Sequence, residues 1–273
     1  MSDANAVGAE NRRRIVLHFR DQFLDLARAS REEVDQYALN ELKNIVKFSK
    51  QRIPWYTNSL EAIANVDASE SLQDLLHSLP ILTRRQVQEN FDGLYFKSPE
   101  YDPNDYVVQS TSGSTGKPVS IMKFAPLYSA EYDALTLTEW QLNNRDTSKT
   151  LSTFRIVQTE LDDAPLGPPL SYIGATRVHT SRSILKRSIP ELLDELHRLR
   201  PDYLFVNGVV TRQLALAQLA SDYEPIKIEQ FLTVSDRIDP QLRILLNDVF
   251  AGRIIDRYSS EEFGYIALQC PVH

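Results

Sequence analysis

Residues 201–208 read Pro-Asp-Tyr-Leu-Phe-Val-Asn-Gly, an apolar run that ends at a turn pair. An apolar run of this length, rich in aromatic side chains and bounded by Pro and Asn-Gly, is typical of a buried strand. On both sides of this run, helix-like segments alternate with further strand-like segments. We predict helices over 188–199, over 211–220 and after Asp239, and strands over 228–234 and 253–258. This alternation predicts an α/β fold with a largely parallel sheet flanked by helices.

The ends of these predicted strands carry small and polar residues. Ligands of open α/β sheets bind beyond the carboxyl ends of the strands. Candidate ligand-binding positions are therefore Asn207-Gly208, Ser235-Asp236 and the run from Ser259 to Glu262.

Upstream of this region the sequence predicts a mainly helical segment. Residues from Arg31 to Gln51 have helical periodicity, Ser30 and Glu33 form a capping box, and Pro54 ends the helix by Ile53. Residues 1–12 are polar and small and predict a loose tail, and residues 162–169, with three prolines and one glycine, predict a loop. The remaining predicted elements are helices over 72–76, after Thr83 and over 128–140, and strands over 106–109, 119–122 and 151–157.

Composition narrows the class of protein. The chain has 273 residues, 42% of them hydrophobic and 25% charged, which is typical of a soluble globular protein. A formal net charge of −7 argues against general nucleic-acid binding, which needs clustered Lys and Arg. One cysteine excludes an internal disulfide, and no apolar run has the roughly 20 residues of a membrane span. We therefore expect a cytoplasmic protein without a membrane span.

The most informative motif is the run Thr-Ser-Gly-Ser-Thr-Gly-Lys-Pro-Val at 111–119, which lies between two predicted strands. Gly113 and Gly116 permit positive φ and a close approach of the backbone to a ligand. Lys117 adds a charge that matches a polyphosphate. The hydroxyls that can donate to phosphate oxygens belong to Thr111, Ser112, Ser114 and Thr115. A Walker P-loop is excluded, because its first glycine would fall on Thr111 and its Ser or Thr on Pro118. A solvent loop between hairpin strands is the alternative.

These residues closely resemble the phosphate-binding loop of the adenylate-forming superfamily, which includes acyl-CoA synthetases, luciferases and peptide-synthetase adenylation domains. The Lys directly before Pro is similar to the phenylacetate–CoA ligase branch. The resemblance implies that residues 111–117 bind the β- and γ-phosphates of ATP and that Lys117 takes part in catalysis.

A second landmark of the family aligns with Tyr258-Ser259-Ser260-Glu261-Glu262. By resemblance, Tyr258 lies against the adenine, and Glu262 binds the magnesium on the phosphates and is the second catalytic residue. Ser259 replaces the family's glycine. Glu261 replaces a threonine that contacts the α-phosphate, and Ser260 is placed to supply a hydroxyl instead. The alternative is that Glu261 and Glu262 open a helix, where acidic side chains suit the helix dipole.

Further likeness lies in Ile53-Pro54-Trp55-Tyr56, in Leu79 to Arg84 and in Arg200 to Leu204, so that the resemblance covers roughly residues 40–273. It implies one large N-terminal, AMP-binding domain over 13–273, cut before the small C-terminal lid domain. The implied cofactors are ATP, Mg²⁺ and coenzyme A, and the implied substrate is a small carboxylic acid, aryl or fatty. Relatives often dimerise, so a homodimer is an expectation, and a longer or separate chain is expected to supply the lid.

Two other functions remain open at this point. In the first, a chain without the lid acts as a non-catalytic module that binds nucleotide or acid. In the second, the chain is an enzyme whose acyl group passes to a protein thiol in place of coenzyme A. Cys270 and His273 have a spacing that can bind zinc, but a structural zinc site needs four ligands and this pair supplies two. A buried cysteine and a terminal histidine without a metal are the simpler interpretation.

Overall fold

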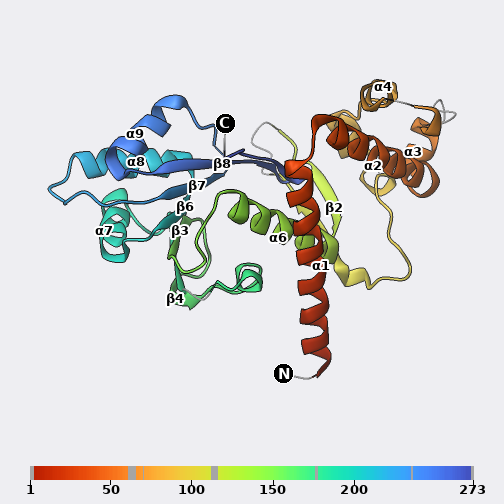
Figure 1. Cartoon of the computed structure of the whole chain (residues 1–273). Helices are drawn as coiled ribbons and strands as arrows, with labels where there is room; N and C mark the ends of the chain where they lie inside the picture. Colours follow the sequence, from red (N-terminus) through yellow and green to blue (C-terminus); the bar gives the residue numbers. More distant parts are fainter. Residues whose placement is uncertain are drawn as a thin grey trace. The chain divides into compact units, whose positions relative to one another are not determined.

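The computed structural model describes residues 3–60, 66–69, 71–111, 116–175, 178–234 and 236–271. Its Cα positions form two compact units, here called unit 1 (1–20 and 132–273) and unit 2 (21–131). The division falls inside two helices, α1 (Asp3–Arg28) and α6 (Ala125–Leu142), which are labelled in Figure 1. The sequence predicted one domain over 13–273 and did not predict this division.

Unit 1 is built around a seven-stranded sheet with the order β4-β5-β3-β6-β7-β8-β9. Neighbours from β5 to β8 pair in parallel, whereas the edge strands β4 and β9 pair antiparallel, so the predicted largely parallel sheet is confirmed. The strands are β3 (Leu151–Arg155), β4 (Leu161–Pro165), β5 (Val178–Ser183), β6 (Tyr203–Val206), β7 (Gln230–Val234), β8 (Arg253–Ser260) and β9 (Gly264–Leu268).

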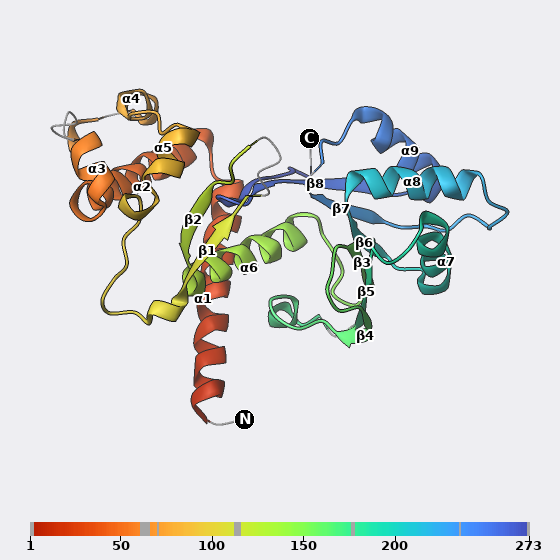
Figure 2. The same ribbon diagram turned by 180° about the vertical axis from the view of Figure 1, so that it is seen from behind.

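Helices cover both faces of this sheet, as Figures 1 and 2 show from opposite sides. On one face Phe154, Leu204 and Phe231 pack into a core with α7 (Ile189–Leu199), α8 (Gly208–Leu219) and α9 (Pro240–Phe250). On the other face α6 contributes Trp140, which meets Tyr203 of β6 edge-on with ring centroids 5.6 Å apart. Because side chains alternate along a strand, Phe205 and Arg257 also belong to the α6 face.

Helices α7 and α9 begin at the residues predicted from the sequence, whereas α8 begins at Gly208, before the predicted start at Thr211. Ser188 caps α7 in a capping box with Glu191, and Asp239 caps α9 with Pro240 in its first turn. Asn207 caps α8, since its side chain accepts a hydrogen bond from the Val210 N–H. Each cap fixes the start of a helix directly after a strand or loop, which places the strand ends next to helix N-termini.

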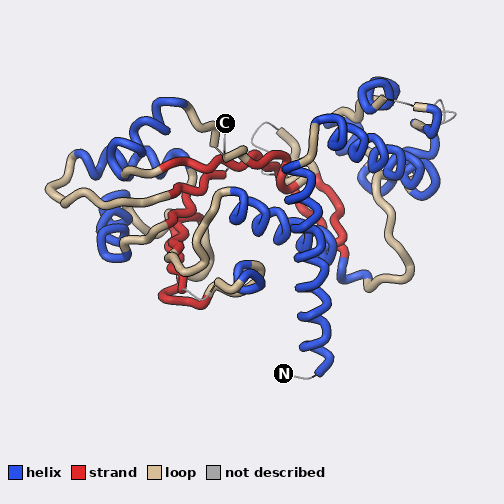
Figure 3. The backbone as a smooth tube through the Cα atoms, in the orientation of Figure 1, coloured by secondary structure: helices blue, strands red, loops and turns tan. Residues whose placement is uncertain are grey.

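Unit 2 combines a helical cluster with a two-stranded hairpin, and Figure 3 shows both by secondary structure. Its core holds Leu39, Val46 and Leu75, together with Leu60 and Val66. The hairpin pairs Tyr106 with Phe124 and Ser110 with Ser120. Its elements are α2 (Arg31–Arg52), α3 (Pro54–Ser59), α4 (Leu72–Ser78), α5 (Arg84–Glu89), β1 (Tyr106–Ser110) and β2 (Ser120–Phe124).

Two segments have a secondary structure that differs from the predicted one. Helix α1 begins at Asp3, although residues 1–12 predicted a loose tail; the segment is rich in alanine, the strongest helix former, and Arg12 forms an ion pair with Asp133 at 2.5 Å. The predicted loop at 162–169 was wrong in its first half, since Leu161–Pro165 form β4. Proline is tolerated there because β4 is an edge strand with an irregular register.

Among the described residues, no helix combines the length and the apolar side chains that a membrane span needs.

Candidate functional site

The hairpin of unit 2 carries the glycine- and hydroxyl-rich loop. Its pairing continues one step past the strands, because Thr111 N donates to the Val119 carbonyl (2.9 Å) and Val119 N donates to Thr111 Oγ1 (3.0 Å). Gly116 has φ +136°, a conformation that favours glycine. The predicted ligands Ser112, Gly113, Ser114 and Thr115 lie outside the described residues. The base of the loop is thus a closed hairpin, and Thr111 uses its hydroxyl oxygen to close it.

Helix α5 holds the far end of the same loop. Arg84 Nη2 donates to the Lys117 carbonyl at 3.0 Å, and Gln88 Nε2 donates to it at 2.5 Å. The Lys117 residue itself is exposed. Its backbone is therefore anchored while its side chain can reach a ligand. Sequence reasoning missed Arg84 and Gln88, and no local signal points to them, because both bonds join residues far apart in the chain.

The second predicted motif lies at the β8–β9 turn of unit 1. Ser260 pairs with Gly264 across the turn, and Ser260 Oγ accepts a hydrogen bond from Phe263 N at 3.1 Å. Glu261 and Glu262 lie in this turn, so the alternative in which they open a helix is wrong. Tyr258 is 65% exposed and thus presents a free ring face to solvent. Glu262 is partly exposed, as a carboxylate that binds a metal together with a phosphate ligand must be.

The ends of β6 and β7 are brought together, as predicted for neighbouring parallel strands. Asp236 Oδ2 accepts a hydrogen bond from Val209 N at 3.1 Å. Gly208 allows this approach, because a Cβ at position 208 would lie 3.2 Å from Asp236 Cβ and 2.9 Å from Ile238 Cδ1. Ser235 lies outside the described residues. Asn207-Gly208 and Asp236 therefore lie side by side at the carboxyl ends of the central strands β6 and β7.

A buried ionic cluster of Glu139, Arg145 and Arg257 supports β8 directly before Tyr258. Glu139 pairs with Arg145 at 2.8 Å and with Arg257 through its other oxygen. Burial alone would raise the pKa of Glu139, but the two arginines outweigh it and lower that pKa. Burial also raises the pKa of Tyr265 strongly, although the Arg257 charge opposes this. Sequence reasoning missed the cluster, whose members lie far apart in the chain.

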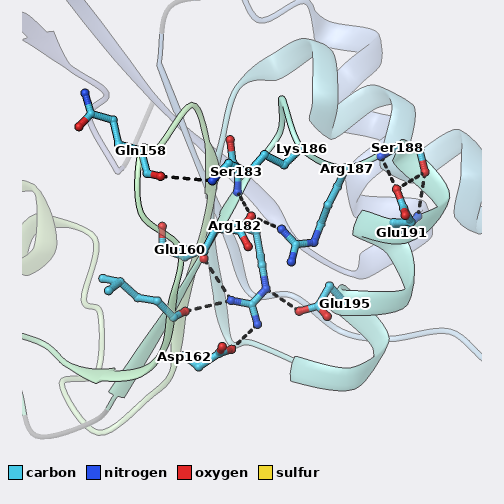
Figure 4. Close-up of polar contacts among 12 residues, drawn as sticks. Gln158, Glu160, Asp162, Arg182, Ser183, Lys186, Arg187, Ser188, Glu191 and Glu195 are labelled. Carbon is cyan, nitrogen blue, oxygen red and sulfur yellow. Dashed lines mark hydrogen bonds and ion pairs between the residues drawn. The ribbon is translucent and has the colours of Figure 1, made fainter.

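A second charged cluster fixes the β4–β5 edge of the sheet, as Figure 4 shows. Arg182 of β5 pairs with Glu195 of α7 at 2.7 Å and also with Asp162 of β4. Burial would lower the pKa of Arg182, but these carboxylates reverse the direction and raise it. Glu160 pairs with Arg187 and accepts a hydrogen bond from Ser183 N at 2.9 Å, and the Arg187 bond is the main reason that its pKa is lowered. These bonds hold the end of β5 in place.

The described part of the chain contains no group of three or more His, Cys, Asp and Glu side chains placed to hold a metal ion. Glu262 is thus the metal-binding candidate from the sequence, and it suits Mg²⁺ only together with ligand oxygens. Cys270 is an exposed free thiol, contrary to the buried cysteine expected, and His273 lies outside the described residues.

Solved structures share this arrangement of strands and helices. An open conformation of 2-hydroxyisobutyryl-CoA ligase in complex with 2-HIB-AMP and CoA matches with a TM-score of 0.63 and 12% identity, over 85% of this chain and 55% of that chain. The same ligase in the postadenylation state with 2-HIB-AMP matches with a TM-score of 0.62 and 14% identity, over 85% and 50%. The chain has the fold of these solved ligase structures.

This chain spans about half the length of those structures. No protein-family model matches it, and no curated protein matches it significantly. The likeness therefore establishes the fold, which agrees with the fold class predicted from the sequence. The matches do not bear on the phenylacetate–CoA ligase branch, which stays a prediction, and the nucleotide-binding roles of the loop and of Tyr258 to Glu262 also stay predictions.

Proposed function

We propose that this chain binds ATP, Mg²⁺ and a carboxylic acid, and that it serves the activation of the acid to an acyl-adenylate and then to a coenzyme A thioester. The strongest support is that an adenylate-forming fold carries Thr-Ser-Gly-Ser-Thr-Gly-Lys-Pro between two antiparallel strands. The solved ligase with this fold was crystallised with an acyl-AMP and CoA. The resemblance favours aryl or fatty acids of the phenylacetate–CoA ligase type.

The main chemical demand of the first step is the stabilisation of negative charge. A substrate carboxylate attacks the α-phosphorus of ATP, an acyl-adenylate forms, and pyrophosphate leaves. Both partners are anions, so positioned donors and a cation must stabilise the charge that develops. We assign the phosphates to the loop from Thr111 to Lys117, which combines backbone N–H groups, hydroxyls and one ammonium group.

The β8–β9 turn is assigned to the nucleotide and its metal. The exposed Tyr258 ring offers a flat apolar face to a base. Glu262 would hold Mg²⁺, which supplies positive charge to the phosphates when it is bound. Ser259, Ser260 and Glu261 are assigned to the nucleotide on resemblance, with the Ser260 hydroxyl in place of the family's threonine. The Ser260 oxygen already accepts from Phe263 N, so its proton remains available for donation to a phosphate.

A thermal-shift titration tests the nucleotide assignment. We expect ATP to raise the melting temperature of the chain, with a larger shift when Mg²⁺ is present, because a ligand that binds only the folded state stabilises it. AMP, which lacks the β- and γ-phosphates, should give a smaller shift. The absence of any shift with millimolar ATP and Mg²⁺ would overturn the proposal.

Acid-dependent exchange of labelled pyrophosphate into ATP separates the enzymatic role from its alternatives. Exchange with aryl or fatty acids supports adenylation, whereas ATP binding without exchange favours a non-catalytic binding module. Trapping the acyl acceptor distinguishes coenzyme A from a protein thiol. A homodimer, and a lid supplied by a longer or separate chain, are proposed from the resemblance, and sizing of the purified chain by light scattering tests the former.

A further inference from the structure

Arg155, at the carboxyl end of β3, is a cation that pairs with no carboxylate among the described residues. Its guanidinium carbon lies 4.6 Å from the centroid of the Phe205 ring on the neighbouring strand β6. The residue is partly exposed. Within the described residues no acidic side chain lies at ion-pair distance from it, whereas nearby Arg182 and Arg187 are both paired. A guanidinium stacked on a ring keeps its N–H edge free for a planar anion.

Ser183, at the carboxyl end of β5, stands directly beside Arg155. The two residues are registered partners on parallel strands and therefore share the α6 face. Ser183 is 1% exposed, and its Oγ has no hydrogen-bond partner in the part of the chain that the structure describes. A buried hydroxyl without a partner is costly and rare, and it calls for a missing polar group. We call Arg155, Ser183 and Phe205 the β3 corner.

The charges around the β3 corner favour an anion. The Arg257 guanidinium carbon lies 5.0 Å from the centroid of the same Phe205 ring, and its buried Nε has no hydrogen-bond partner within the described residues. Glu139 is shared between Arg257 and Arg145, so one carboxylate faces two arginines. Glu160, which accepts from Ser183 N, is neutralised by Arg187. Arg145 and Arg257 together carry one positive charge more than Glu139 balances, and the Glu160–Arg187 pair is neutral. The surroundings of Arg155 therefore carry excess positive charge.

The position of the β3 corner separates it from the proposed nucleotide residues. In the sheet order, β3 and β8 are separated by β6 and β7. At about 4.8 Å per strand this corresponds to about 14 Å between the strand ends. The side chains narrow this gap, since the guanidinium carbons of Arg155 and Arg257 lie 4.6 and 5.0 Å from the centroid of the same Phe205 ring. Arg155 nevertheless stands on a strand that two others separate from β8, where it faces the far end of an extended acid that reacts there.

We propose that the β3 corner binds a second carboxylate of the acid, and that the substrates are dicarboxylic acids. The inference rests on the proposed function for the reacting end of the substrate. The Arg155 guanidinium binds the distal carboxylate through two parallel N–H bonds, and the Ser183 hydroxyl donates a third. Phe205 fixes the plane of the guanidinium and covers one side of it.

Binding of matched acid pairs to the 273-residue chain tests this assignment. The pairs are terephthalate with benzoate and adipate with hexanoate, titrated by calorimetry at constant ionic strength in the presence of AMP and Mg²⁺. We expect each dicarboxylate to bind the wild type more tightly than its monoacid by roughly 10- to 100-fold, since hydrogen bonds to charged groups contribute that much. Equal affinities for the two members of both pairs would overturn the proposal.

Three variants locate the effect. Arg155→Gln should abolish the preference for dicarboxylates, and Ser183→Ala should reduce it several-fold without lowering the melting temperature, since the lost hydroxyl has no described partner. Lys227→Gln removes the same charge at an exposed position and should leave the preference unchanged. A preference that persists in Arg155→Gln refutes the β3 corner. If Arg155→Gln fails to fold, Arg155→Lys, which keeps the charge but loses the planar fork, must weaken the preference instead.

ATP-dependent thermal shifts on the same samples separate this inference from the proposed function. A wild type that responds to ATP but does not prefer dicarboxylates refutes the β3 corner alone. A wild type that prefers dicarboxylates through Arg155 but does not respond to ATP refutes the nucleotide proposal and retains the anion site.

Discussion

Asp236 and Val209 are joined by a hydrogen bond of 3.1 Å from the Val209 N–H to the Asp236 carboxylate. The bond links the loop after β7 to the first turn of α8, and so connects the carboxyl ends of two neighbouring strands. The carboxylate lies against the N-terminus of α8, where a negative charge is stabilised by the helix dipole. The glycine at position 208 makes room for this contact, since a Cβ there would lie 3.2 Å from Asp236 Cβ and 2.9 Å from Ile238 Cδ1.

Substitution of two glycines should therefore have unequal effects. In Gly208→Ala the new Cβ meets the flexible end of Ile238 at 2.9 Å, whereas in Gly252→Ala it would lie 2.1 Å from the Ile228 carbonyl oxygen, which forces the backbone to move. We expect losses in the free energy of unfolding of about 1 kcal/mol for Gly208→Ala and about 3 kcal/mol for Gly252→Ala. Urea denaturation measures both, with Gly167→Ala, whose Cβ meets nothing within 4 Å, as the control.

The Glu139 cluster predicts a large loss of stability on neutralisation. Glu139→Gln leaves Arg145 and Arg257 buried without a counter-charge, and breaking a buried pair in this way costs about 3–5 kcal/mol. Asp35→Asn removes an exposed ion pair with Arg31 and should leave the unfolding curve almost unchanged. Similar effects of the two substitutions in urea denaturation would contradict the assigned role of Glu139.

The same carboxyl group predicts a pH dependence. Because the folded-state pKa of Glu139 lies below its ordinary value of 4.5, its contribution to stability is complete above about pH 4.5 and is lost as the pH falls through the folded pKa. The difference in free energy of unfolding between wild type and Glu139→Gln should be largest at neutral pH and shrink in acid. A difference that stays constant from pH 7 to pH 3 would show that charge is not its cause.

Two substitutions test the proposed phosphate and metal ligands. Lys117→Ala should reduce the ATP-dependent rise in melting temperature with or without Mg²⁺, because it removes a cation from the phosphates. Glu262→Gln should remove mainly the additional shift that Mg²⁺ produces, because an amide is a weaker ligand for this ion than a carboxylate. Both side chains are at least partly exposed, so the melting temperatures without ligand should be close to that of the wild type. A full ATP response in both variants would refute the assignments.

The anchoring of the loop by α5 offers a paired test. Arg84 donates to the Lys117 carbonyl, whereas its neighbour Arg85 pairs only with Glu89 among the described contacts. We expect Arg84→Ala to weaken ATP binding several-fold, since a less ordered loop must lose more entropy when it binds, and Arg85→Ala to leave ATP binding unchanged. Equal affinities of the two variants for ATP would show that the anchor does not matter.

Local signals account for what the sequence predicted correctly. Ser30 with Glu33, Thr83 with Gln86 and the proline at position 54 predicted where helices begin and end, and the structure confirms each. The strand–loop–strand pattern around residues 111–119 is likewise confirmed as a hairpin. These features depend on residues only a few positions apart, and their chemistry fixes the backbone nearby.

Contacts between distant residues account for what the sequence did not predict. The β8–β9 turn looks like a helix start because two acidic residues follow two serines, and only pairing with β9 decides otherwise. The Glu139–Arg257 pair, the Arg84 anchor and the register of Arg155 with Ser183 all join separate elements. No local sequence pattern indicates any of these contacts, so the residues of the β3 corner were not among the predicted site residues.

The shared carboxylate of Glu139 also limits how related sequences can diverge. Arg145 and Arg257 depend on one acidic side chain, so the loss of Glu139 leaves two buried guanidiniums without a counter-charge, whereas the loss of either arginine leaves a balanced pair. The three positions therefore differ in how freely they can change. Homologous chains should accordingly vary more often at one of the two arginines than at Glu139 alone.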